Sequence, residues 1–567
     1  MVRQKMRHQN TCLFPPESHI GLDMLKECQI HPPKIMTKRM SKSLSKYFAF
    51  EEWFLQSPVF IIFYVLSTGL PAFDWWAVPP DSVFMKMYLF NVTNSERFLA
   101  GLDDKLDMVE YGPITYLEKL EHTNITFNEN GTMSYTAKRT LQFLPEQNKG
   151  IDLNATIIVV NLPVLGFISY VNNRIPLGKM PFNLYLWGTS PKVFRTLSVY
   201  DYLWNFTDPI MTTGRMYLPG IVPISNLGVL QTMYMKPVDR LTVYTGTRWG
   251  DRRFFTLDNF EGRTRLPNFP DDSSCLQTVQ GSTEGLIYSQ RLQKNSTLLY
   301  WRKTLCKIIE LNYVEEVDFR GVNAYSYQMP TTGYYRTHND SDPDCYAGEP
   351  RLLDGLSDIS NSMNSRARFQ KNMFLNFLFN KIVIIFFLKL LSCLNFPMAL
   401  SLPHFYGTPP AVSNRITGFK PDAEKHLSYA IVEPVRYITV FSSIQKHCYR
   451  LLGFGEHGCH KTIFLLTFSF SQFSIEYNST KTSQNLYKIK INIYFMYDVF
   501  QTTGIPLESR ARSQSNLVVG KLTGFSPIYQ KFSEINVPMF WAEYRGLYVG
   551  AYIVRLCLLA LKVHVSQ

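Results

Sequence analysis

Short apolar runs recur along the chain from about residue 75 onward. Examples are "SVFMKMYLFNVT" (82–93), "ATIIVVNLPVLGF" (155–167), "RLTVYTG" (240–246) and "TLLYWRKTL" (297–305). They are rich in β-branched and aromatic residues, and Gly, Pro, Asn and Asp separate them, which is typical of strands joined by turns. No unit of about 20–50 residues repeats, which excludes a solenoid or propeller. The pattern predicts a mainly β protein.

One segment has a helical period instead. In "SPKVFRTLSVYDYLWNF" (190–206), apolar residues recur at spacings that place them near one face of a helix, at Phe194, Leu197, Tyr200 and Leu203. We therefore predict a helix over 190–206, and a fold class that is mainly β with some helices.

Two apolar segments inside the chain lack the pattern of a membrane span. The run "PVFIIFYVL" (58–66) has nine residues, whereas a spanning helix needs about 20, so it is predicted to be a buried strand. In "KNMFLNFLFNKIVIIFFLKLLSC" (371–393), lysines limit the uncharged runs to nine residues (372–380) and seven residues (382–388), and Lys381 lies near the middle. A lysine at mid-bilayer costs about 2.5–3.5 kcal/mol on insertion scales, so this segment is a poor membrane helix.

Composition indicates a globular chain, and the charge distribution argues against nucleic acid as a partner. Of 567 residues, 46% are hydrophobic and 18% are charged, which excludes a disordered chain. The net charge of +13 is concentrated in three segments, since 1–46 carries +6, 363–395 carries +5 and 435–501 carries +4. The rest of the chain is therefore near −2, and no basic face spans it.

Glycosylation sequons indicate the secretory pathway. The pattern Asn-x-Ser/Thr occurs seven times between residues 91 and 339, at Asn91, Asn124, Asn130, Asn154, Asn205, Asn295 and Asn339. We expect these asparagines to be exposed and glycosylated. An eighth sequon, at Asn478, is discounted because it lies in a segment interpreted below as an insert. Oxidising conditions would allow some of the nine cysteines to form structural disulfides.

Several short motifs together resemble one family. In chain order they are "WWAVPPDSVFMKMYLFNVTN" (75–94), "YGPITY" (111–116), "VYTGTRWGD" (243–251), "CLQTVQGSTEG" (275–285), "LCKIIELNY" (305–313), "SLPHFYGTPP" (401–410), "AIVEP" (430–434), "TTGIPLESRARSQSN" (502–516) and "VPMFWAEY" (537–544). Their order and chemistry resemble the CD36-type, class B scavenger receptor family, which includes lysosomal and insect sensory-neuron members.

The resemblance implies a glycosylated ectodomain held between two membrane helices. Its fold would be an irregular antiparallel β-barrel with an apolar tunnel and a helical bundle at the apex. The family's members bind lipids or lipoproteins and pass hydrophobic cargo to the membrane, without an enzyme's chemistry, a cofactor or a metal. The plasma membrane is the favoured location, and a lysosomal or endosomal membrane is the alternative. The competing function is an adhesion or trafficking receptor that binds a protein partner through the apex.

By position in the family, residues 178–204 supply the apex. Lys192 and Arg195 are then expected to present positive charge to acidic headgroups, although ordinary solvated residues are an equal alternative. His404, in "LPHF", is the histidine that the resemblance marks, and we interpret it as a structural residue. The chain contains no H-E-x-x-H, G-x-S-x-G or Walker A motif, so no catalytic residues are proposed.

The resemblance also divides the chain. Residues 1–70 form an atypical N-terminal region without a recognisable first anchor, and 71–544 form the ectodomain. Residues 545–567 are a short apolar segment, interrupted by Arg555, that resembles a truncated anchor. Segments 363–395 and 435–501 separate motifs that adjoin in the family, so we interpret both as inserts. Their Phe-, Ile-, Asn- and Lys-rich composition suggests translated introns, and genuine lineage-specific loops are the alternative.

Four cysteines fall where the family places ectodomain disulfides, or close to it. They allow three pairings, and the family analogy selects Cys275–Cys345 and Cys306–Cys393.

Two other sequence patterns give only weak evidence for a binding site. The string "GFGEHG" (453–458) matches a dinucleotide-binding pattern without the helix that should follow, and the cysteines of "HC" (447–448) and "HGCH" (457–460) lack the spacing of a zinc knuckle.

Overall fold

In the computed structural model, the chain divides into two units. The larger is Val65–Pro434 with Thr503–Gln567, and the smaller is Met1–Tyr64 with Val435–Thr502. The structure describes residues 73, 76–79, 83–174, 179–217, 225–235, 238–246, 253–266, 269, 275, 277–289, 292–319, 322–336, 344–348, 351–359, 398–432, 436–451, 472–482, 486–501 and 506–547. The predicted strand at 58–66 and the apolar segment 371–393 lie outside the described residues, as does the C-terminal segment beyond 547.

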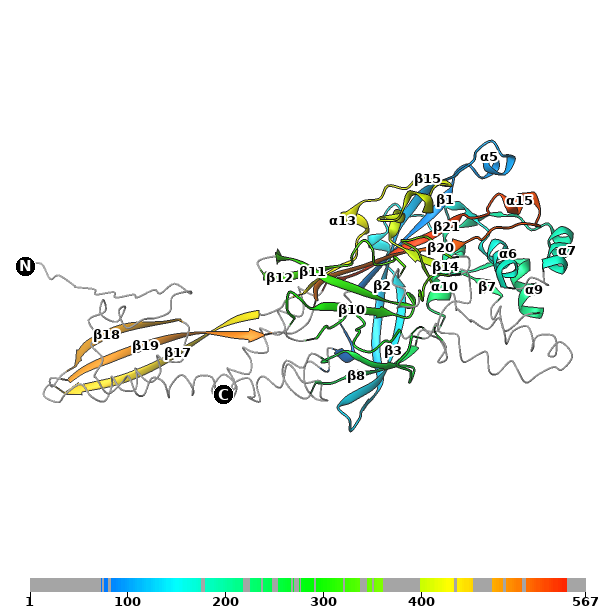
Figure 1. Ribbon diagram of the computed structural model, residues 1–567. Helices are drawn as coiled ribbons and strands as arrows, with labels where there is room; N and C mark the ends of the chain where they lie inside the picture. The colour runs from blue at the N-terminus through cyan, green and yellow to red at the C-terminus, as the bar shows by residue number, and fades with distance from the viewer. Residues whose placement is uncertain are drawn as a thin grey trace, which may run out of the picture. The chain divides into compact units, whose positions relative to one another are not determined.

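A 14-stranded sheet forms the centre of the larger unit, which confirms the prediction of a mainly β fold (Figure 1). Eleven strands follow the path β10-β11-β12-β16-β20-β21-β1-β2-β3-β8-β9, while β13, β14 and β15 pair beside it. The pairings are antiparallel except for β15 with β2. The strands are β1 (Val83–Val92), β2 (Leu106–Phe127), β3 (Thr132–Phe143), β8 (Val238–Tyr244), β9 (Leu257–Phe260), β10 (Thr297–Arg302), β11 (Lys307–Phe319), β12 (Val322–Gln328), β13 (Ser357–Asp358), β14 (Met398–Ser401), β15 (Ile416–Thr417), β16 (Tyr429–Val432), β20 (Pro506–Val518) and β21 (Asn536–Leu547).

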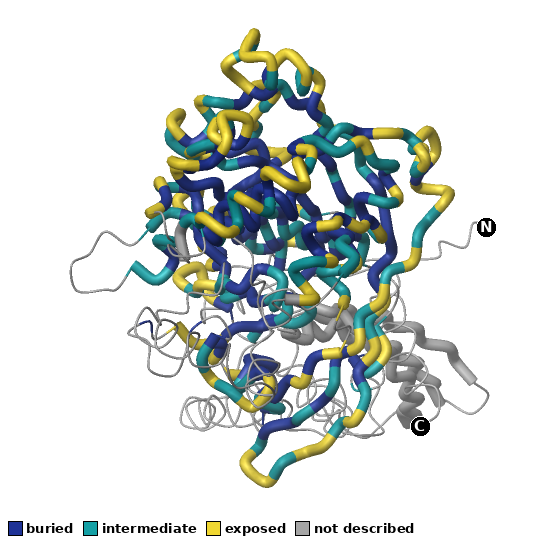
Figure 2. The backbone as a smooth tube through the Cα atoms, turned by 90° about the vertical axis from the view of Figure 1, so that its right-hand side faces the viewer, coloured by how far each residue is buried: buried dark blue, intermediate teal, exposed yellow. Residues whose placement is uncertain are grey.

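Alternation of side chains along the central strand β1 explains its place in the sheet. Met85, Met87 and Leu89 are fully buried on one face of this strand. Lys86, on the other face, forms an ion pair with Glu543 of β21 at 3.6 Å. Successive residues of a strand point to opposite faces, so the sequence "VFMKMYLFNV" gives β1 one face that is fully buried at Met85, Met87 and Leu89, and another on which Lys86 lies among aromatic residues. Figure 2 shows buried positions concentrated through the body of this unit.

The two outer strands of the path, β9 and β10, do not pair with each other, yet one loop contacts both. The backbone N–H of Leu257 in β9 donates to the carbonyl of Ser282 at 2.8 Å. One residue later, the N–H of Thr283 donates to the carbonyl of Leu299 in β10 at 2.8 Å, and Trp301 donates back to Thr283 at 2.9 Å. Backbone hydrogen bonds from this loop therefore reach both edge strands, which would otherwise expose unpaired groups there.

Among the described residues, eight α-helices accompany the sheets, and none is long and apolar enough to cross a membrane. Figure 1 shows α6, α7 and α9 together beyond one end of the central strands. The helices are α5 (Ser95–Ala100), α6 (Leu162–Arg174), α7 (Lys179–Thr189), α8 (Val199–Trp204), α9 (Pro209–Tyr217), α10 (Val229–Met233), α13 (Ala423–His426) and α15 (Pro527–Gln530), with 3₁₀ turns η1 (Pro145–Gln147), η4 (Pro403–Phe405) and η5 (Pro410–Val412).

The predicted helix over 190–206 is wrong for its first half. Phe194–Ser198 forms strand β5, which pairs antiparallel with β4 (Thr156–Val160). Only α8, Val199–Trp204, is helical, because Ser198 ends the strand and caps the helix: its side chain accepts a hydrogen bond from the N–H of Asp201. Pairing with β4 therefore overrides the helical spacing upstream of this cap. A second small sheet pairs β6 (Phe206–Thr207) with β7 (Asn226–Leu227).

The smaller unit contains a three-stranded antiparallel sheet in the order β17-β19-β18. Its strands are β17 (Arg436–Leu451), β18 (Gln472–Thr482) and β19 (Leu486–Gln501). They lie within the segment 435–501, whose origin as an insert stays a prediction. The "GFGEHG" string lies outside the described residues.

Candidate functional site

A cavity lies against the large sheet. Its volume is about 70 Å³. A single water needs roughly 10–15 Å³, so the cavity can hold something larger. The apolar and aromatic residues of its wall come from distant parts of the chain and include Val83, Leu120, Leu286, Tyr288, Tyr300, Leu305, Ile309, Leu311, Tyr334, Ala511 and Tyr544.

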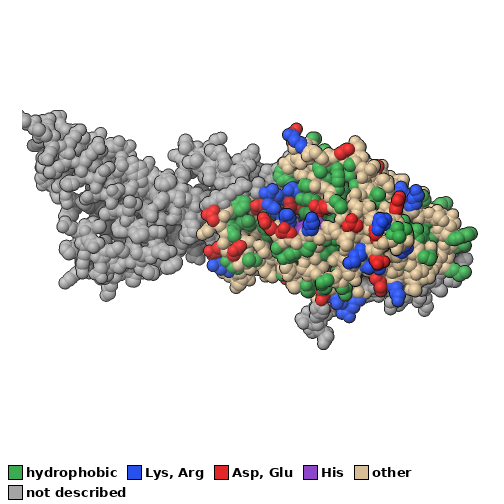
Figure 3. Space-filling model, turned by 90° about the horizontal axis from the view of Figure 1, so that it is seen from above, with side chains coloured by type: hydrophobic (Ala, Val, Ile, Leu, Met, Phe, Trp, Pro, Cys, Tyr) green, Lys and Arg blue, Asp and Glu red, His purple; other side chains and the backbone are tan. Residues whose placement is uncertain are grey.

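Strand β20 shows how the sequence keeps this cavity open. Its segment "ESRARSQ" alternates charged or polar residues with small ones. Residues 509–513 all line the cavity, and the small side chains of Ser509, Ala511 and Ser513 leave space beside those of Arg510 and Arg512. The charged residues of the segment make their ion pairs on β20 and β21: Arg512 donates to Glu543 at 2.7 Å, and Arg510 donates to Glu508 at 2.9 Å. On the face shown in Figure 3, acidic and basic side chains are interspersed.

A buried cluster of charges contributes Glu118, Arg139, Glu284 and Arg302 to the cavity wall, whose polar part also includes Arg510 and Arg512. Arg302 of β10 pairs with Glu118 of β2, and Arg139 of β3 pairs with Glu284. Arg139 also lies 3.8 Å from Glu118 and 3.4 Å from Asp239 of β8. Lys303 donates to Asp239 at 2.6 Å. The cluster therefore balances three carboxylates with the charges of Arg139, Arg302 and Lys303.

Tyrosines complete this cluster and fix its geometry. The hydroxyl of Tyr234 donates to Glu118 at 3.1 Å, and Tyr135 donates to Glu284 at 2.8 Å. The guanidinium of Arg302 lies over the ring of Tyr544 at 3.9 Å, a cation–π contact. Burial opposes the charge of Arg302, but the Glu118 carboxylate more than offsets it and raises the pKa of Arg302 well above its ordinary value.

The charged cluster also separates two spaces. A second, smaller cavity of about 20 Å³ is lined by Tyr234, Asp239 and Lys303. Arg139, Glu284, Trp301 and Arg302 line both this cavity and the larger one. We call these four shared residues the charged partition. An apolar solute in the larger cavity would therefore meet charged side chains rather than a continuous apolar passage into the smaller one.

A buried histidine stands beside the cluster. The Nδ1 atom of His122 lies 2.7 Å from the carbonyl of Trp76, and the two rings stack at 4.3 Å. In the part of the chain that the structure describes, the other ring nitrogen, Nε2, has no hydrogen-bond partner. Burial lowers the pKa of His122 from 6.5 to about 4, because a proton added at Nε2 would leave a charge without water or an acceptor.

This histidine should make the protein less stable in acid. Between pH 6.5 and 4 the unfolded state binds a proton at His122 and the folded state does not, so the free energy of unfolding falls as pH falls through that window. We expect His122 to contribute about 3 kcal/mol to the loss between pH 7 and 4. Urea unfolding of the wild type and of His122→Phe at both pH values measures this. Equal pH dependence in the two proteins would contradict the assignment.

His404 occupies a structural position outside the cavity wall. Its Nε2 lies 2.7 Å from Glu110, which also accepts from the indole N–H of Trp541 at 2.6 Å. Its Nδ1 accepts the backbone N–H of Lys420 at 3.2 Å, and its ring stacks on His426 at 4.5 Å. Both ring nitrogens are therefore engaged, in agreement with the structural interpretation.

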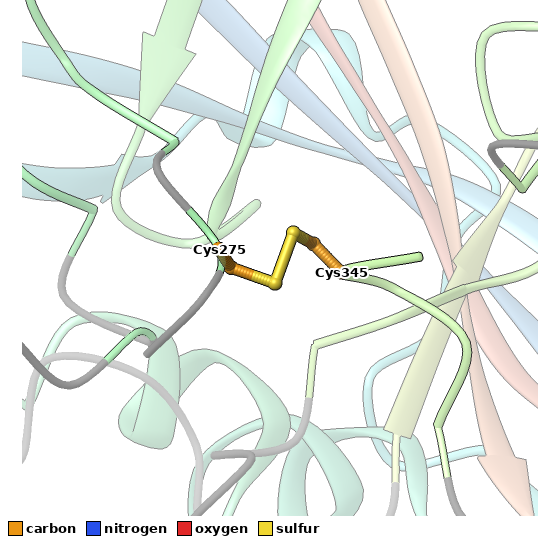
Figure 4. Close-up of a disulfide and its surroundings, with 2 residues drawn as sticks. All are labelled: Cys275 and Cys345. Carbon is orange, nitrogen blue, oxygen red and sulfur yellow. A yellow bond between two sulfur atoms is a disulfide. The ribbon is translucent and has the colours of Figure 1, made fainter. Parts of the chain in front are cut away.

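The predicted disulfide Cys275–Cys345 is confirmed (Figure 4). The two Cα atoms lie 5.6 Å apart, although 70 positions separate the residues in sequence. Cys306 is also disulfide-bonded. Its predicted partner, Cys393, lies outside the described residues, so the pairing Cys306–Cys393 stays a prediction.

Most of the sequon asparagines are exposed, with one correction. The exposed ones are Asn124, Asn130, Asn154, Asn205 and Asn295. Asn91 is only partly exposed, because it lies within β1, where its Oδ1 accepts the backbone N–H of Ile158 at 2.8 Å. Asn339 lies outside the described residues. Glycosylation of these residues stays a prediction.

The two predicted apex cations differ in their surroundings. Lys192 is exposed. Arg195 is half-buried and pairs with the buried carboxylate of Asp208 at 3.0 Å. That carboxylate also accepts from the side-chain amide of Asn161 at 3.0 Å. The charge of Arg195 is therefore already neutralised within the protein, and recognition of a ligand by either cation stays a prediction.

Sequence reasoning missed the charged cluster. Glu118, Arg139, Asp239, Glu284 and Arg302 come from separate strands and one loop, and each looks like an ordinary charged residue of a solvated position. A weak signal was present, because Glu284 falls in the motif "CLQTVQGSTEG", but no local spacing links it to Arg139.

A sequence model of the CD36 family matches residues 46–376, 387–443 and 492–565. The unmatched intervals 377–386 and 444–491 lie within the two segments interpreted as inserts, whose wider boundaries stay predictions. The match also extends into the N-terminal region, where no first anchor was recognised, and into the C-terminal segment, which resembles a truncated anchor.

Curated relatives give the same result. The bovine protein "Scavenger receptor class B member 1" is 24% identical over 375 residues, which cover 66% of each chain. Its mouse counterpart is 24% identical over 406 residues, covering 71% of this chain and 72% of the relative. Human "Lysosome membrane protein 2" is 25% identical over 382 residues, covering 65% and 69%. The alignment thus spans just under two thirds of the bovine relative's length. Because the family match extends over most of the sequence, this chain belongs to the CD36 family.

Proposed function

We propose that this protein is a membrane scavenger receptor that binds lipids or lipoproteins and moves hydrophobic cargo through the interior of its ectodomain. The observation that carries the proposal is the cavity against the large sheet, whose wall is mostly apolar and aromatic. Transfer of apolar surface out of water is favourable by about 25 cal/mol per Å², so such a wall would stabilise a lipid chain. Membership of a family with relatives named scavenger receptors supports the assignment.

The conduit would be an irregular antiparallel barrel with an apolar tunnel. Two features support this finer proposal. Residues 281–283 hydrogen-bond to both edge strands of the large sheet, β9 and β10. The small residues of β20 leave space in the cavity, and Gly546 of β21 lines the same cavity. In this proposal the charged partition between the two cavities would mark a constriction in the passage.

The helices beyond the end of the strands would form the ligand-facing apex. Met180, Leu184 and Trp187 of α7 follow an i, i+4, i+7 spacing and are 83%, 67% and 81% exposed. An exposed apolar stripe on one face of a helix suits contact with a lipid particle. Lys192 is exposed and could add positive charge, whereas Arg195 is held by Asp208.

The same stripe favours the second candidate function, an adhesion or trafficking receptor that binds a protein partner through the apex. An apolar helix face can equally contact a partner protein. The two functions differ in their need for the cavity, since a protein ligand held at the apex would not use it.

Membrane attachment belongs to the proposal. The ectodomain would be extracellular, at the plasma membrane, or lumenal, in a lysosomal or endosomal membrane. The family match over 46–70 and 545–565 supports anchors in those regions.

A cavity-filling variant tests the function. Radiolabelled hexadecanol should bind the purified wild type and should bind Ala511→Phe at least about tenfold more weakly, because the larger ring would occupy the cavity and displace several methylene groups. Glu316→Gln, an exposed site away from the cavity wall, is the matched control and should bind normally. A wild type that binds no hexadecanol would contradict lipid handling. Normal binding by a folded Ala511→Phe would contradict the cavity as the site.

A further inference from the structure

We propose that His404 and His426 form an acid-sensitive switch that holds residues 418–428, and through them one side of the cavity wall, in place at neutral pH. These residues, called the 418–428 loop below, include α13. The inference concerns a change of conformation and does not depend on what the cavity binds.

The two histidines are buried side by side, and each accepts a backbone hydrogen bond from the loop. Their ring centres lie 4.5 Å apart in a stacked arrangement. The Nδ1 atom of His404 accepts the N–H of Lys420 at 3.2 Å, and the Nδ1 atom of His426 accepts the N–H of Asp422 at 2.9 Å. Because a backbone N–H can only donate, neither Nδ1 atom carries a proton. Each imidazole is therefore neutral, with its proton on Nε2.

A proton added to either ring must take the place of a hydrogen bond that holds the loop. The protonated Nδ1 atom would face another donor, the backbone N–H of Lys420 or Asp422. Protonation of both rings would also place two positive charges 4.5 Å apart. Acid therefore favours an open arrangement, in which the loop has moved away and the imidazoles reach water.

In the described part of the chain, charged groups of three segments face the pair. Glu110 of β2 lies 2.7 Å from Nε2 of His404, Asp422 precedes α13, and Arg512 belongs to β20. Burial and then the neighbouring His404 ring lower the pKa of His426 from 6.5 to about 4. Glu110 and Asp422 oppose this change, whereas Arg512 adds to it. Aromatic side chains of β1 and β21 also contact the pair and carry no charge.

The lowered pKa of His426 links opening of the loop to pH. In the open arrangement the ring would regain its ordinary pKa of 6.5, so the open arrangement binds the proton more readily and gains population as pH falls from 6.5 to 4. Between pH 7 and 5 this linkage predicts about a 20-fold rise in the equilibrium constant for opening. Despite its burial, hydrogen bonds from two neighbouring rings lower the pKa of Glu110, and a backbone hydrogen bond lowers that of Asp422. Both carboxylates therefore stay ionised over this range.

The 418–428 loop is joined to the cavity wall by hydrogen bonds. Through Nη1, Arg512 donates to the carbonyls of Glu424 at 2.9 Å and Leu427 at 2.6 Å. The hydroxyl of Ser428 accepts the backbone N–H of Arg512 at 2.9 Å and donates to its carbonyl at 3.1 Å. Ser428 and Arg512 both line the cavity. Movement of the loop would therefore release Arg512 and alter the cavity wall on this side.

The backbone beside the pair is strained, as in many switch regions. His404 and the next residue, Phe405, both have a φ of 54°, in the left-handed region that residues other than glycine rarely adopt. Such a conformation persists only where its surroundings fix it. Here the backbone N–H of His404 donates to the buried side chain of Gln514 at 2.8 Å. Side-chain hydrogen bonds therefore help to hold the closed arrangement.

Hydrogen–deuterium exchange of the full chain at pH 7 and pH 5 tests the inference. The amides of Lys420 and Asp422 donate to the histidines, so their exchange, corrected for the intrinsic effect of pH, reports the opening. We expect their protection factors to fall about 20-fold at pH 5 in the wild type. The amide of Arg512, which donates to Ser428, should lose protection with them.

The variant His426→Asn separates the histidine from other effects of acid. Its side-chain oxygen can accept the hydrogen bond of Asp422 in place of Nδ1 and takes no proton in this range, so the loss of protection should shrink to about twofold. His122→Phe, which removes a buried histidine elsewhere, should respond as the wild type does. The β4–β5 sheet contains no histidine and should keep its protection at pH 5.

Four results would contradict the inference. Equal protection of the loop at both pH values, or an equal response in the wild type and His426→Asn, would overturn the switch. An equal loss in the β4–β5 sheet would show unfolding of the whole unit instead. A loss in the loop without one at Arg512 would overturn the link to the cavity wall. Should His426→Asn not fold, the wild-type pH profile decides: a fall in protection between pH 6.5 and 4 supports the histidine, whereas one that begins only below pH 4.5 assigns the effect to a carboxylate and overturns the inference.

Discussion

Glu118→Gln is expected to lower the free energy of unfolding of the larger unit by about 3–5 kcal/mol. Glutamine keeps the size of the side chain and can still accept the hydrogen bond from Tyr234. It removes the charge that compensates Arg302, whose guanidinium is buried between Glu118 and the ring of Tyr544. A buried cation that loses its partner bears the full cost of desolvation, which sets the size of the effect.

The double variant Glu118→Gln/Arg302→Met should lose much less stability than Glu118→Gln alone. It removes one negative and one positive charge together, so the remaining cluster stays balanced. Arg139 keeps Glu284 and Asp239 as partners, and Lys303 keeps Asp239. A double-mutant cycle from urea unfolding curves, followed by tryptophan fluorescence, measures the coupling between the two residues.

An exposed ion pair provides the matched control. Lys294 and Glu316 lie 2.8 Å apart, and their side chains are 58% and 47% exposed. Exposed pairs contribute about 0–1 kcal/mol, so Glu316→Gln should change stability by no more than that. If Glu118→Gln and Glu316→Gln had equal effects, the charged cluster would not be a desolvated part of the core, and the partition between the two cavities would lose its physical basis.

The strands of the large sheet could be predicted from the sequence because their pattern is local. In "VFMKMYLFNV" the run of apolar and aromatic residues is readable without knowledge of neighbours, and β1 forms there. The helix over 190–206 could not be predicted correctly, because the partner of Phe194–Ser198 is Thr156–Val160, about 40 positions upstream. The sequence of the segment itself does not indicate a partner strand at that distance. Pairing with this strand nevertheless overrides the helical spacing of the apolar residues.

The candidate site is less predictable than the strands for the same reason. Glu284 stands in the motif "CLQTVQGSTEG" with nothing to distinguish it from a solvated glutamate. Its role in the cavity wall depends on Arg139 and Tyr135, which are distant in sequence and reach it through tertiary folding. The disulfide Cys275–Cys345 could be anticipated because the resemblance provided the pairing that the sequence left open among three.

Loss of the Cys275–Cys345 disulfide is expected to destabilise the larger unit by roughly 4–5 kcal/mol, less any native-state strain that its removal relieves. The bond closes a loop of 70 positions. In the chain-entropy model, removing such a crosslink mainly gives the unfolded chain more conformations, so the native contacts around the cysteines should change little. Thermal unfolding of Cys275→Ser/Cys345→Ser against the wild type, both without reductant, measures the effect.

Replacing both cysteines by alanine separates the effect of losing the crosslink from the cost of burying a serine hydroxyl. Cys275 packs in an apolar cluster that includes Phe269 and Val279, where a serine hydroxyl would add a cost of its own. Cys275→Ala/Cys345→Ala removes the same crosslink without a new polar group. Similar losses in both variants would assign the effect to loop closure. A loss in the serine variant with almost none in the alanine variant would show that burial of a hydroxyl was responsible, and the crosslink would then contribute little to stability.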